Sequence, residues 1–193
     1  MNNLIQAKVL IIVAPSGAGK TTLARRLLAD HPKIKFSVSA TTRSPREGEK
    51  NGHDYYFLTD DEFDTKIQHN CFLEWEYYSG DRYGTLQSEV DKLVDNGYFP
   101  LLDIEVKGAL NVQQIYGRDA ISVFIKPPSM EVLAGRLQKR GSETKDSLAK
   151  RLQRAQEELT FADQFDYAVI NDDLDTAYTE LKAIIEPFIT DQS

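Results

Sequence analysis

The sequence is poor in features typical of secreted or membrane-bound proteins. Only one of its 193 residues is a cysteine, Cys71, so no disulfide can form within the chain, which fits a reducing compartment. Its first residues, MNNLIQAK, lack the basic start of a secretory signal. No apolar run approaches the length of a membrane span. We therefore expect a cytoplasmic protein that does not bind a membrane.

The chain also lacks an excess of positive charge. The chain has 23 Lys and Arg residues against 30 Asp and Glu residues, for a net charge of −7. This balance argues against a protein that binds nucleic acid non-specifically. If the ligands are anionic, an acidic chain must gather its cations locally. The three histidines, His31, His53 and His69, lack the spacing of metal ligands, so we assign them no chemistry.

The segment from Val9 to Thr22 organises the rest of the chain. It runs VLIIVAPSGAGKTT, and its apolar half predicts a parallel strand buried on both faces. Its second half matches G-x-x-x-x-G-K-[ST] at every fixed position except the first, where Ala14 stands. The residues after Lys20 have helical spacing. A strand, a glycine-rich turn and a helix N-terminus in this order predict a phosphate-binding loop.

The loop indicates a nucleoside triphosphate as a ligand. Lys20 would contact the β- and γ-phosphates, and the hydroxyl of Thr21 would bind Mg²⁺. The alternative is a glycine-rich turn that only joins a strand to a helix. The residues expected to bind the triphosphate are Ala14, Pro15, Ser16, Gly17, Ala18, Gly19, Lys20, Thr21 and Thr22.

Two other segments carry charged groups suited to phosphate chemistry. Arg43 and Arg46 flank Pro45, which stiffens the loop and can aim two guanidinium groups at one anion. The alternative for this polar segment is a solvated surface loop. Asp103 and Glu105 lie at the end of a predicted apolar strand. In a phosphate-loop protein, an acidic residue there contacts Mg²⁺ directly or through water.

Strand and helix patterns alternate near both ends of the chain and predict a parallel α/β sheet. The strands expected in it are Val9–Ala14, Phe99–Ile104, Ala120–Ile125 and Tyr167–Ile170. Residues 36–97 interrupt this rhythm with shorter strands that look antiparallel. These are Phe36–Ala40, Asp54–Leu58 and Phe72–Tyr78. The expected fold is α/β, with a parallel sheet core of the P-loop NTPase type flanked by helices and a small mixed α+β insertion.

A series of short motifs runs through nearly the whole chain. The most specific is S-A-T-T-R-S-P-R-E-G-E at residues 39–49. The others are Asn51-Gly52, Asp54-Tyr55, Phe72–Trp75, Tyr83–Thr85, Asp103-Ile104, Pro127–Ser129, Arg136-Leu137, Arg140-Gly141 and Val169–Asp173. In their order and spacing these motifs resemble guanylate kinase. The resemblance implies an enzyme that transfers the γ-phosphoryl group of ATP to GMP, giving ADP and GDP, with Mg²⁺.

The resemblance also implies a division of one domain, residues 1–193. The core would comprise residues 1–35, 98–128 and 161–193, the GMP-binding region residues 36–97, and a helical lid residues 129–160. Mg²⁺ would be held by Thr21 and Asp103. The implied catalytic residues are Lys20, Arg43, Arg136, Arg140 and Arg151, with Arg136 and Asn171 also contacting ATP.

For the acceptor, the resemblance implies a larger set of residues. They are Ser39, Arg43, Arg46, Tyr55, Glu74, Tyr83, Gly84, Thr85, Asp103 and Glu105. The arginines and tyrosines would hold the phosphate. Ser39, Glu74, Thr85 and Glu105 would contact the guanine, and Glu105 stands where an aspartate is usual. Glu74 can accept from two guanine donors at once. Its alternative is an exposed position on the strand, paired with a lysine or arginine.

Two other functions compete with this one. A non-catalytic scaffold domain of the same family would bind a peptide, but such domains typically lose the phosphate loop. A related phosphate-loop kinase acting on a phosphorylated sugar would not need the residues assigned to the guanine. For an enzyme of this kind we expect small-molecule partners, no nucleic acid, and a monomer or a weak homo-oligomer.

Overall fold

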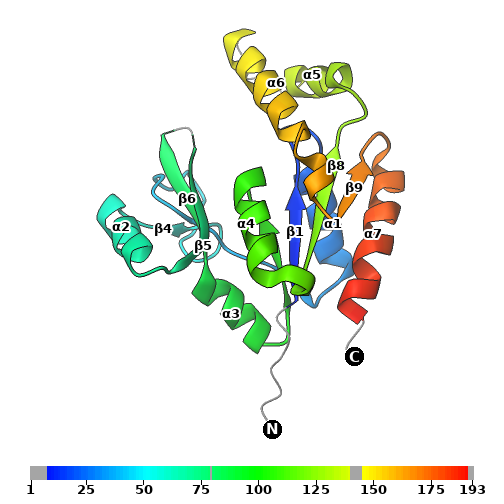
Figure 1. Cartoon of the computed structure of the whole chain (residues 1–193). Coiled ribbons are helices and arrows are strands. Elements are labelled where there is room, and N and C mark those ends of the chain that lie inside the picture. The colour runs from blue at the N-terminus through cyan, green and yellow to red at the C-terminus, as the bar shows by residue number, and fades with distance from the viewer. Residues whose placement is uncertain (1–7, 79, 140–144, 191–193) are drawn as a thin grey trace. The chain divides into compact units, whose positions relative to one another are not determined.

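Strands and helices alternate along most of the chain (Figure 1), and the computed structural model describes residues 8–78, 80–139 and 145–190. The strands are β1 (Val9–Val13), β2 (Ile34–Phe36), β3 (Ala40–Thr41), β4 (Tyr56–Phe57), β5 (Phe72–Tyr78), β6 (Asp81–Leu86), β7 (Phe99–Asp103), β8 (Ala120–Lys126) and β9 (Tyr167–Ile170). The helices are α1 (Lys20–Asp30), α2 (Asp60–Gln68), α3 (Gln87–Asp95), α4 (Val106–Tyr116), α5 (Met130–Lys139), α6 (Lys145–Leu159) and α7 (Leu174–Thr190). No helix among these residues is both long and apolar enough to cross a bilayer.

A five-stranded sheet has the order β2-β7-β1-β8-β9. Strands β2 and β7 pair in parallel, and so do β8 and β9, which confirms the predicted α/β class. All five residues of β1 are buried, as the apolar run before the glycine-rich turn predicts. A sheet with parallel strands buried on both faces requires helices to cover it.

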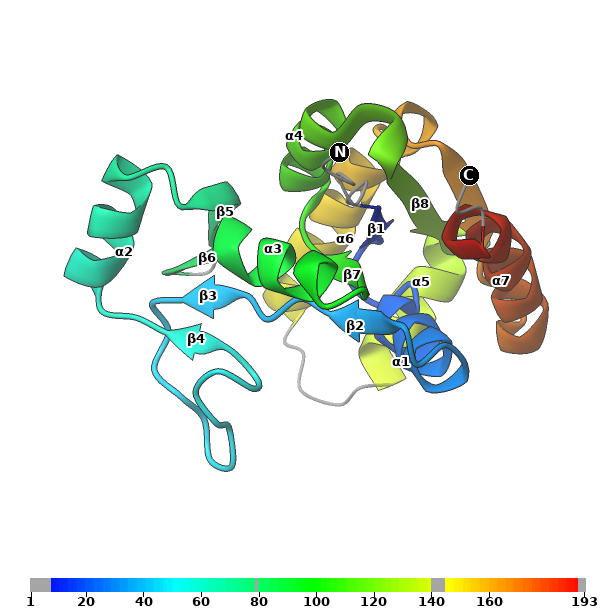
Figure 2. The same cartoon turned by 90° about the horizontal axis from the view of Figure 1, so that it is seen from below.

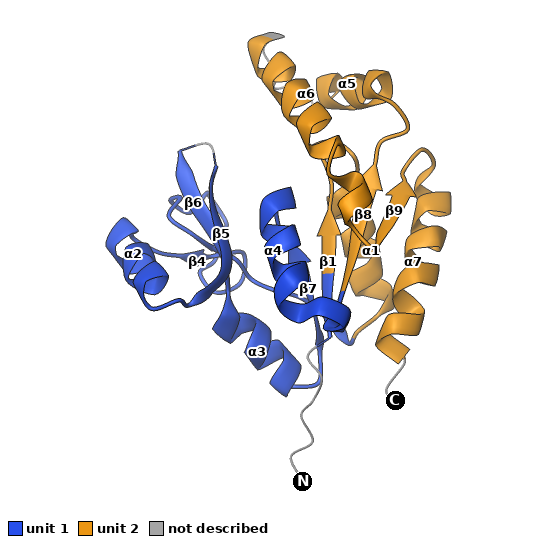
Figure 3. Ribbon diagram, viewed as in Figure 1, with its two compact units in different colours: residues 1–10, 33–120 blue, residues 11–32, 121–193 orange. Residues whose placement is uncertain are grey.

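The chain divides into two units, shown in different colours in Figure 3. Unit 1 comprises residues 1–10 and 33–120, and unit 2 comprises residues 11–32 and 121–193. Unit 1 therefore holds the insertion predicted over residues 36–97 together with β7 and α4. Unit 2 holds the glycine-rich turn, α1 and the C-terminal helices.

Unit 1 contains a second sheet of four strands in the order β4-β3-β6-β5. Strand β6 pairs antiparallel with both β3 and β5, whereas β3 and β4 are parallel. Thr59 begins α2 with a capping box, since its hydroxyl accepts from the amide of Glu62 while the Glu62 carboxylate accepts from the amide of Thr59. The ring of Phe63 on α2 stacks on Phe72 of β5, with 4.4 Å between centroids.

The predicted strand over Phe36–Ala40 is wrong. Strand β2 ends at Phe36 and β3 begins at Ala40, and Figure 2 shows the chain passing from one to the other. The two strands belong to different sheets, since β2 pairs with β7 and β3 pairs with β4 and β6. Alternating apolar and polar residues cannot reveal such a change of sheet, because the pattern continues across it.

Two pairs of helices pack against each other within unit 2. Helix α1 contacts α7, where Arg26 forms an ion pair with Asp175 and the hydroxyl of Tyr178 donates to Asp30 at 2.6 Å. Helix α5 packs on α6 through a small core of Leu133, Leu137 and Ala155. The pair α5–α6 covers most of the described part of the predicted lid.

Candidate active site

The glycine-rich turn of unit 2 has the backbone that a phosphate-binding loop requires. Gly17 and Gly19 have φ angles of +92° and +99°, which side chains with a Cβ rarely adopt. The amide of Ala18 donates to the carbonyl of Pro15 at 3.0 Å, closing the turn. Helix α1 then begins at Lys20, directly after Gly19. Its first amide groups and its dipole therefore lie at the end of the turn.

Both glycines are also needed for close packing. A Cβ on Gly17 would lie 2.9 Å from the side chain of Leu137, and one on Gly19 would lie 2.1 Å from the side chain of Asn171. The Asn171 amide donates to the carbonyl of Ala18 at 2.7 Å, and Asn171 is buried. Asn171 therefore braces the backbone of the turn, a contact that the sequence did not predict.

Ala14 departs from the loop motif without straining the backbone. Among the described residues other than glycine, Asn70 alone has a positive φ. A Cβ at position 14 therefore meets no left-handed conformation, and the first glycine of the motif is not needed here for that reason.

Two of the predicted lid arginines contact elements around the turn. Nη2 of Arg151, on α6, donates to Oγ of Ser16 at 3.0 Å. Nη2 of Arg136, on α5, donates to the carbonyl of Asp172 at 3.2 Å, next to the residue that braces the turn. The helix pair α5–α6 thus brings cations to the turn. Arg140, the third predicted arginine, lies outside the described residues.

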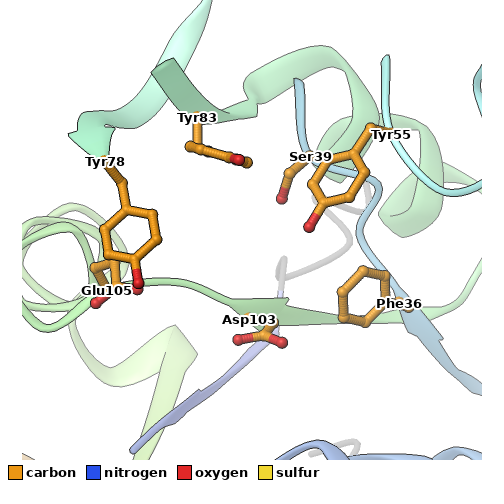
Figure 4. A pocket seen from close by; sticks show the side chains of 7 residues that line it. All are labelled: Phe36, Ser39, Tyr55, Tyr78, Tyr83, Asp103 and Glu105. Atoms are coloured by element: carbon orange, nitrogen blue, oxygen red, sulfur yellow. The ribbon is translucent and has the colours of Figure 1, made fainter. Parts of the chain in front are cut away.

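Unit 1 contains a cavity of about 240 Å³. Five of its lining residues were predicted from the sequence as acceptor-binding residues, and their side chains come from separate segments of unit 1 (Figure 4). They are Ser39, Tyr55, Tyr83, Asp103 and Glu105. The rings of Tyr55 and Tyr83 meet edge to face, 6.0 Å between centroids. The structure therefore brings together residues that are 66 positions apart.

The cavity has two further lining residues, Phe36 and Tyr78, that the sequence did not point out. For each of them, the sequence contained a weaker indication that the residue lies near a ligand site. Phe36 ends β2, and ligands of parallel sheets bind beyond the carboxyl ends of the strands. Tyr78 shares one face of β5 with Glu74, because side chains on a strand alternate.

Glu74 is buried, with 9% of its surface exposed. Its Oε1 accepts from the hydroxyl of Thr85, also buried, at 2.6 Å across the β5–β6 pair. Burial raises the pKa of the Glu74 carboxyl, while the bond from Thr85 opposes this shift. The alternative of an exposed Glu74 paired with a lysine or arginine is wrong.

The carboxylate of Glu74 fits against α4 because the residue that faces it there is a glycine. A Cβ on Gly108 would lie 2.5 Å from Oε2 of Glu74. The carboxylate therefore lies against the helix backbone where only glycine leaves room. On β6, Gly84 is needed for a similar reason, since a Cβ there would lie 2.8 Å from the ring of Phe72. This packing explains a glycine at position 84 without any ligand.

The two arginines predicted to hold the acceptor phosphate have different surroundings. Arg43 is 13% exposed at its side chain and pairs with Glu49 at 2.9 Å, whereas Arg46 is exposed. The Arg43 guanidinium also lies over the ring of Tyr55, 5.4 Å from its centroid. Arg43 is therefore held in a fixed orientation beside a residue that lines the cavity.

The two residues predicted to bind a metal ion each supply an oxygen atom, which suits a hard cation. Among the described residues, no group of three or more His, Cys, Asp or Glu side chains can hold a metal ion. The predicted ligands are instead one hydroxyl, on Thr21 of unit 2, and one carboxylate, on Asp103 of unit 1. Mg²⁺ prefers such oxygen atoms and usually keeps waters and substrate phosphates as its other ligands.

Comparison with known proteins gives one family. The family model described as guanylate kinase matches residues 6–187. A guanylate kinase of Chlorobium chlorochromatii is 48% identical over 182 residues, covering 94% of this chain and 96% of the relative. One of Salinibacter ruber is also 48% identical, with coverage of 94% and 97%. A crystal structure of guanylate kinase from Anaplasma phagocytophilum superposes with a TM-score of 0.74 at 30% identity, covering 96% of this chain and 87% of that one. The chain belongs to the guanylate kinase family.

Proposed function

We propose that this chain transfers the γ-phosphoryl group of ATP to GMP, giving ADP and GDP. The observation that carries the proposal is the cavity of unit 1, where five predicted acceptor residues from distant segments line one space. The phosphate-binding turn of unit 2 supplies the second requirement, a site for the donor. Curated relatives named guanylate kinase support the same pairing of substrates.

The reaction needs no general base. The second pKa of a phosphate monoester is about 6, so the acceptor is largely a dianion at neutral pH. The work left to the protein is to position two highly charged groups and to stabilise the charge of the transition state. The amides of the turn, Lys20, Arg136 and Arg151 are suited to the donor phosphates. Thr21 and Asp103 would hold Mg²⁺, which would supply positive charge to offset the negative charge of the phosphates.

On the acceptor, we assign the phosphate to Arg43, Arg46, Tyr55 and Tyr83. Ser39, Glu74, Thr85 and Glu105 would contact the guanine. Residues 129–160 would act as a lid that excludes water, since water competes with GMP for the phosphoryl group. Arg140 would join Arg136 and Arg151 in this lid. The negative net charge supports an enzyme that acts without nucleic acid. We further propose a cytoplasmic location and a monomer or a weak homo-oligomer.

An assay that couples ADP release to a detectable signal tests the proposal. With ATP as donor, we expect kcat/KM for GMP to exceed that for AMP, CMP and UMP by about 10⁴, because buried polar groups reject a base that leaves them unpaired. Including dGMP shows whether the 2′-hydroxyl contributes. Equal rates with all nucleotides, or no ADP release with GMP, would refute the proposed function.

Replacing Arg43 or Arg46 with alanine should raise KM for GMP at least about tenfold and lower kcat as well, because forked contacts both bind and position the acceptor. KM for ATP should change far less. The effect of Arg43→Ala should be the larger, since its side chain is mostly buried and Arg46 is exposed. Steady-state kinetics with each substrate varied measures both constants.

The matched control is Lys50→Ala, which removes an exposed cation from the same loop. It should leave KM for GMP close to that of the unmodified protein. A weakened affinity for ATP with unchanged affinity for GMP in either arginine variant would mean that residues 41–52 serve the donor instead.

A further inference from the structure

The guanidinium group of Arg43 is held on several sides. Its Nη2 donates to Oε1 of Glu49 at 2.9 Å, and its Nη1 donates to the carbonyl of Ser44 at 2.8 Å. Its central carbon lies over two rings, 5.4 Å from the centroid of Tyr55 and 5.7 Å from that of Phe57. A guanidinium group has five N–H donors. These two bonds therefore orient Arg43 without using all of its donors.

Glu49 is joined to the second arginine as well. Its Oε2 accepts from the backbone amide of Arg46 at 2.7 Å, and its own amide donates to the carbonyl of Arg46 at 3.1 Å. One carboxylate thus ties the side chain of Arg43 to the backbone of Arg46. The bond from Arg43 lowers the pKa of Glu49, so the carboxylate is ionised at neutral pH.

Two effects of this carboxylate on an anionic ligand have opposite signs. Its negative charge beside the arginines repels a phosphate dianion, so its removal would strengthen binding by Coulomb attraction alone. Its bonds hold the arginines in one arrangement, so its removal would weaken binding. The second effect should be larger here, because Glu49 is only 19% exposed and contacts both arginines. A preorganised fork loses less entropy when it binds.

We propose that Glu49 is a positioning residue for the phosphate of the acceptor nucleotide, holding Arg43 and the backbone of Arg46 in the orientation that binds it. This inference rests on the proposed function, in which these two arginines hold the phosphate of GMP. Glu49 itself does not touch the substrate. It acts through the two arginines.

The test is Glu49→Ala, compared with the unmodified protein in the same coupled assay. We expect KM for GMP to rise about tenfold and KM for ATP to stay within about twofold, because only the acceptor arginines lose their support. The matched control is Glu47→Ala, which removes the same charge from an exposed position two residues away. The control should leave both constants nearly unchanged. Calorimetric titration with GMP should show the same loss of affinity.

A second variant, Glu49→Gln, separates positioning from charge. Glutamine removes the charge but keeps one acceptor oxygen, so it preserves one of the two bonds. Positioning predicts a KM for GMP between those of the unmodified protein and Glu49→Ala. If Glu49→Ala does not fold, Glu49→Gln tests the proposal by itself. A KM for GMP that is higher in Glu49→Gln than in the unmodified protein then supports the proposal.

Three results would overturn the proposal. An unchanged or lowered KM for GMP in either variant would mean that the negative charge dominates or that Glu49 has no role. An equal rise in KM for GMP and ATP would indicate a general structural defect. Failure of the proposed function is a separate outcome, because it shows in the unmodified protein as an absence of phosphoryl transfer to GMP.

Discussion

Replacing Lys20 with alanine should lower kcat at least about a thousandfold, because the variant lacks a cation that faces the charge of the transition state. Lys20 is the first residue of α1 and directly follows Gly19, where the turn meets the helix. In a phosphate-binding loop of this motif, the lysine at this position contacts the β- and γ-phosphates. The backbone of the turn does not depend on this side chain, since it is set by the two glycines and by Asn171.

Circular dichroism and thermal unfolding should therefore show a folded Lys20→Ala protein. The matched control is Arg25→Ala, which removes an exposed cation from the same helix and should retain nearly full activity. If Lys20→Ala keeps kcat close to that of the unmodified protein, the turn does not take part in the chemistry.

Replacing Glu74 with leucine should abolish most of the preference for GMP over AMP. Guanine presents its N1–H and its 2-amino group side by side, and a carboxylate can accept from both. Adenine presents an acceptor at N1 and has no 2-amino group, so the buried carboxylate would lose its partners. Sites built on such pairing discriminate by about 10⁴ or more. We expect the ratio of kcat/KM for GMP to that for AMP to collapse, mainly through loss of activity with GMP.

In the structure, Glu74 and Thr85 do not line the cavity of unit 1. Oε1 of Glu74 accepts a hydrogen bond from the hydroxyl of Thr85. A carboxylate has about four acceptor positions, so the bond from Thr85 leaves acceptor capacity for a base. Because burial raises the pKa of Glu74, its charged form is costly, and donors from guanine would offset that cost.

The graded variant is Glu74→Gln, which keeps one acceptor oxygen and should give an intermediate ratio. KM for ATP should be nearly the same in both variants and in the unmodified protein. An unchanged GMP-to-AMP ratio in Glu74→Leu would show that this carboxylate does not select the base.

The phosphate-binding turn could be recognised from the sequence because its parts are contiguous. A buried strand, a glycine-rich turn and a helix follow one another within residues 9–30, and each is specified by neighbouring residues. Gly17 and Gly19 show in the sequence that a left-handed backbone is available there. The capping box at Thr59 is local in the same way. For such features the sequence is sufficient, since the interacting groups lie within a few positions of one another.

The surroundings of Glu74 depend on contacts that no local pattern contains. Alternation on β5 separates Glu74 from Trp75 but does not say which face is buried. The structure buries the glutamate and leaves Trp75 46% exposed, because α4 packs on β5 and its Gly108 leaves room for the carboxylate. That helix begins 32 positions after Glu74. Pairing with Thr85 likewise depends on the register of β5 and β6.

Dependence on long-range contacts also explains why β6 and the end of β2 could not be predicted from the sequence. The polar segment Asp81–Leu86 contains Gly84 and lacks a strong strand pattern, yet it forms a strand because β3 and β5 pair with it on either side. Strand β2 ends at Phe36 and strand β3 begins at Ala40. They belong to different sheets because β2 pairs with β7 and β3 pairs with β6, and both partners lie in distant segments. Local sequence specified the glycine-rich turn. The cavity of unit 1 formed only when separate segments paired, since strand partners and buried faces are set by long-range packing.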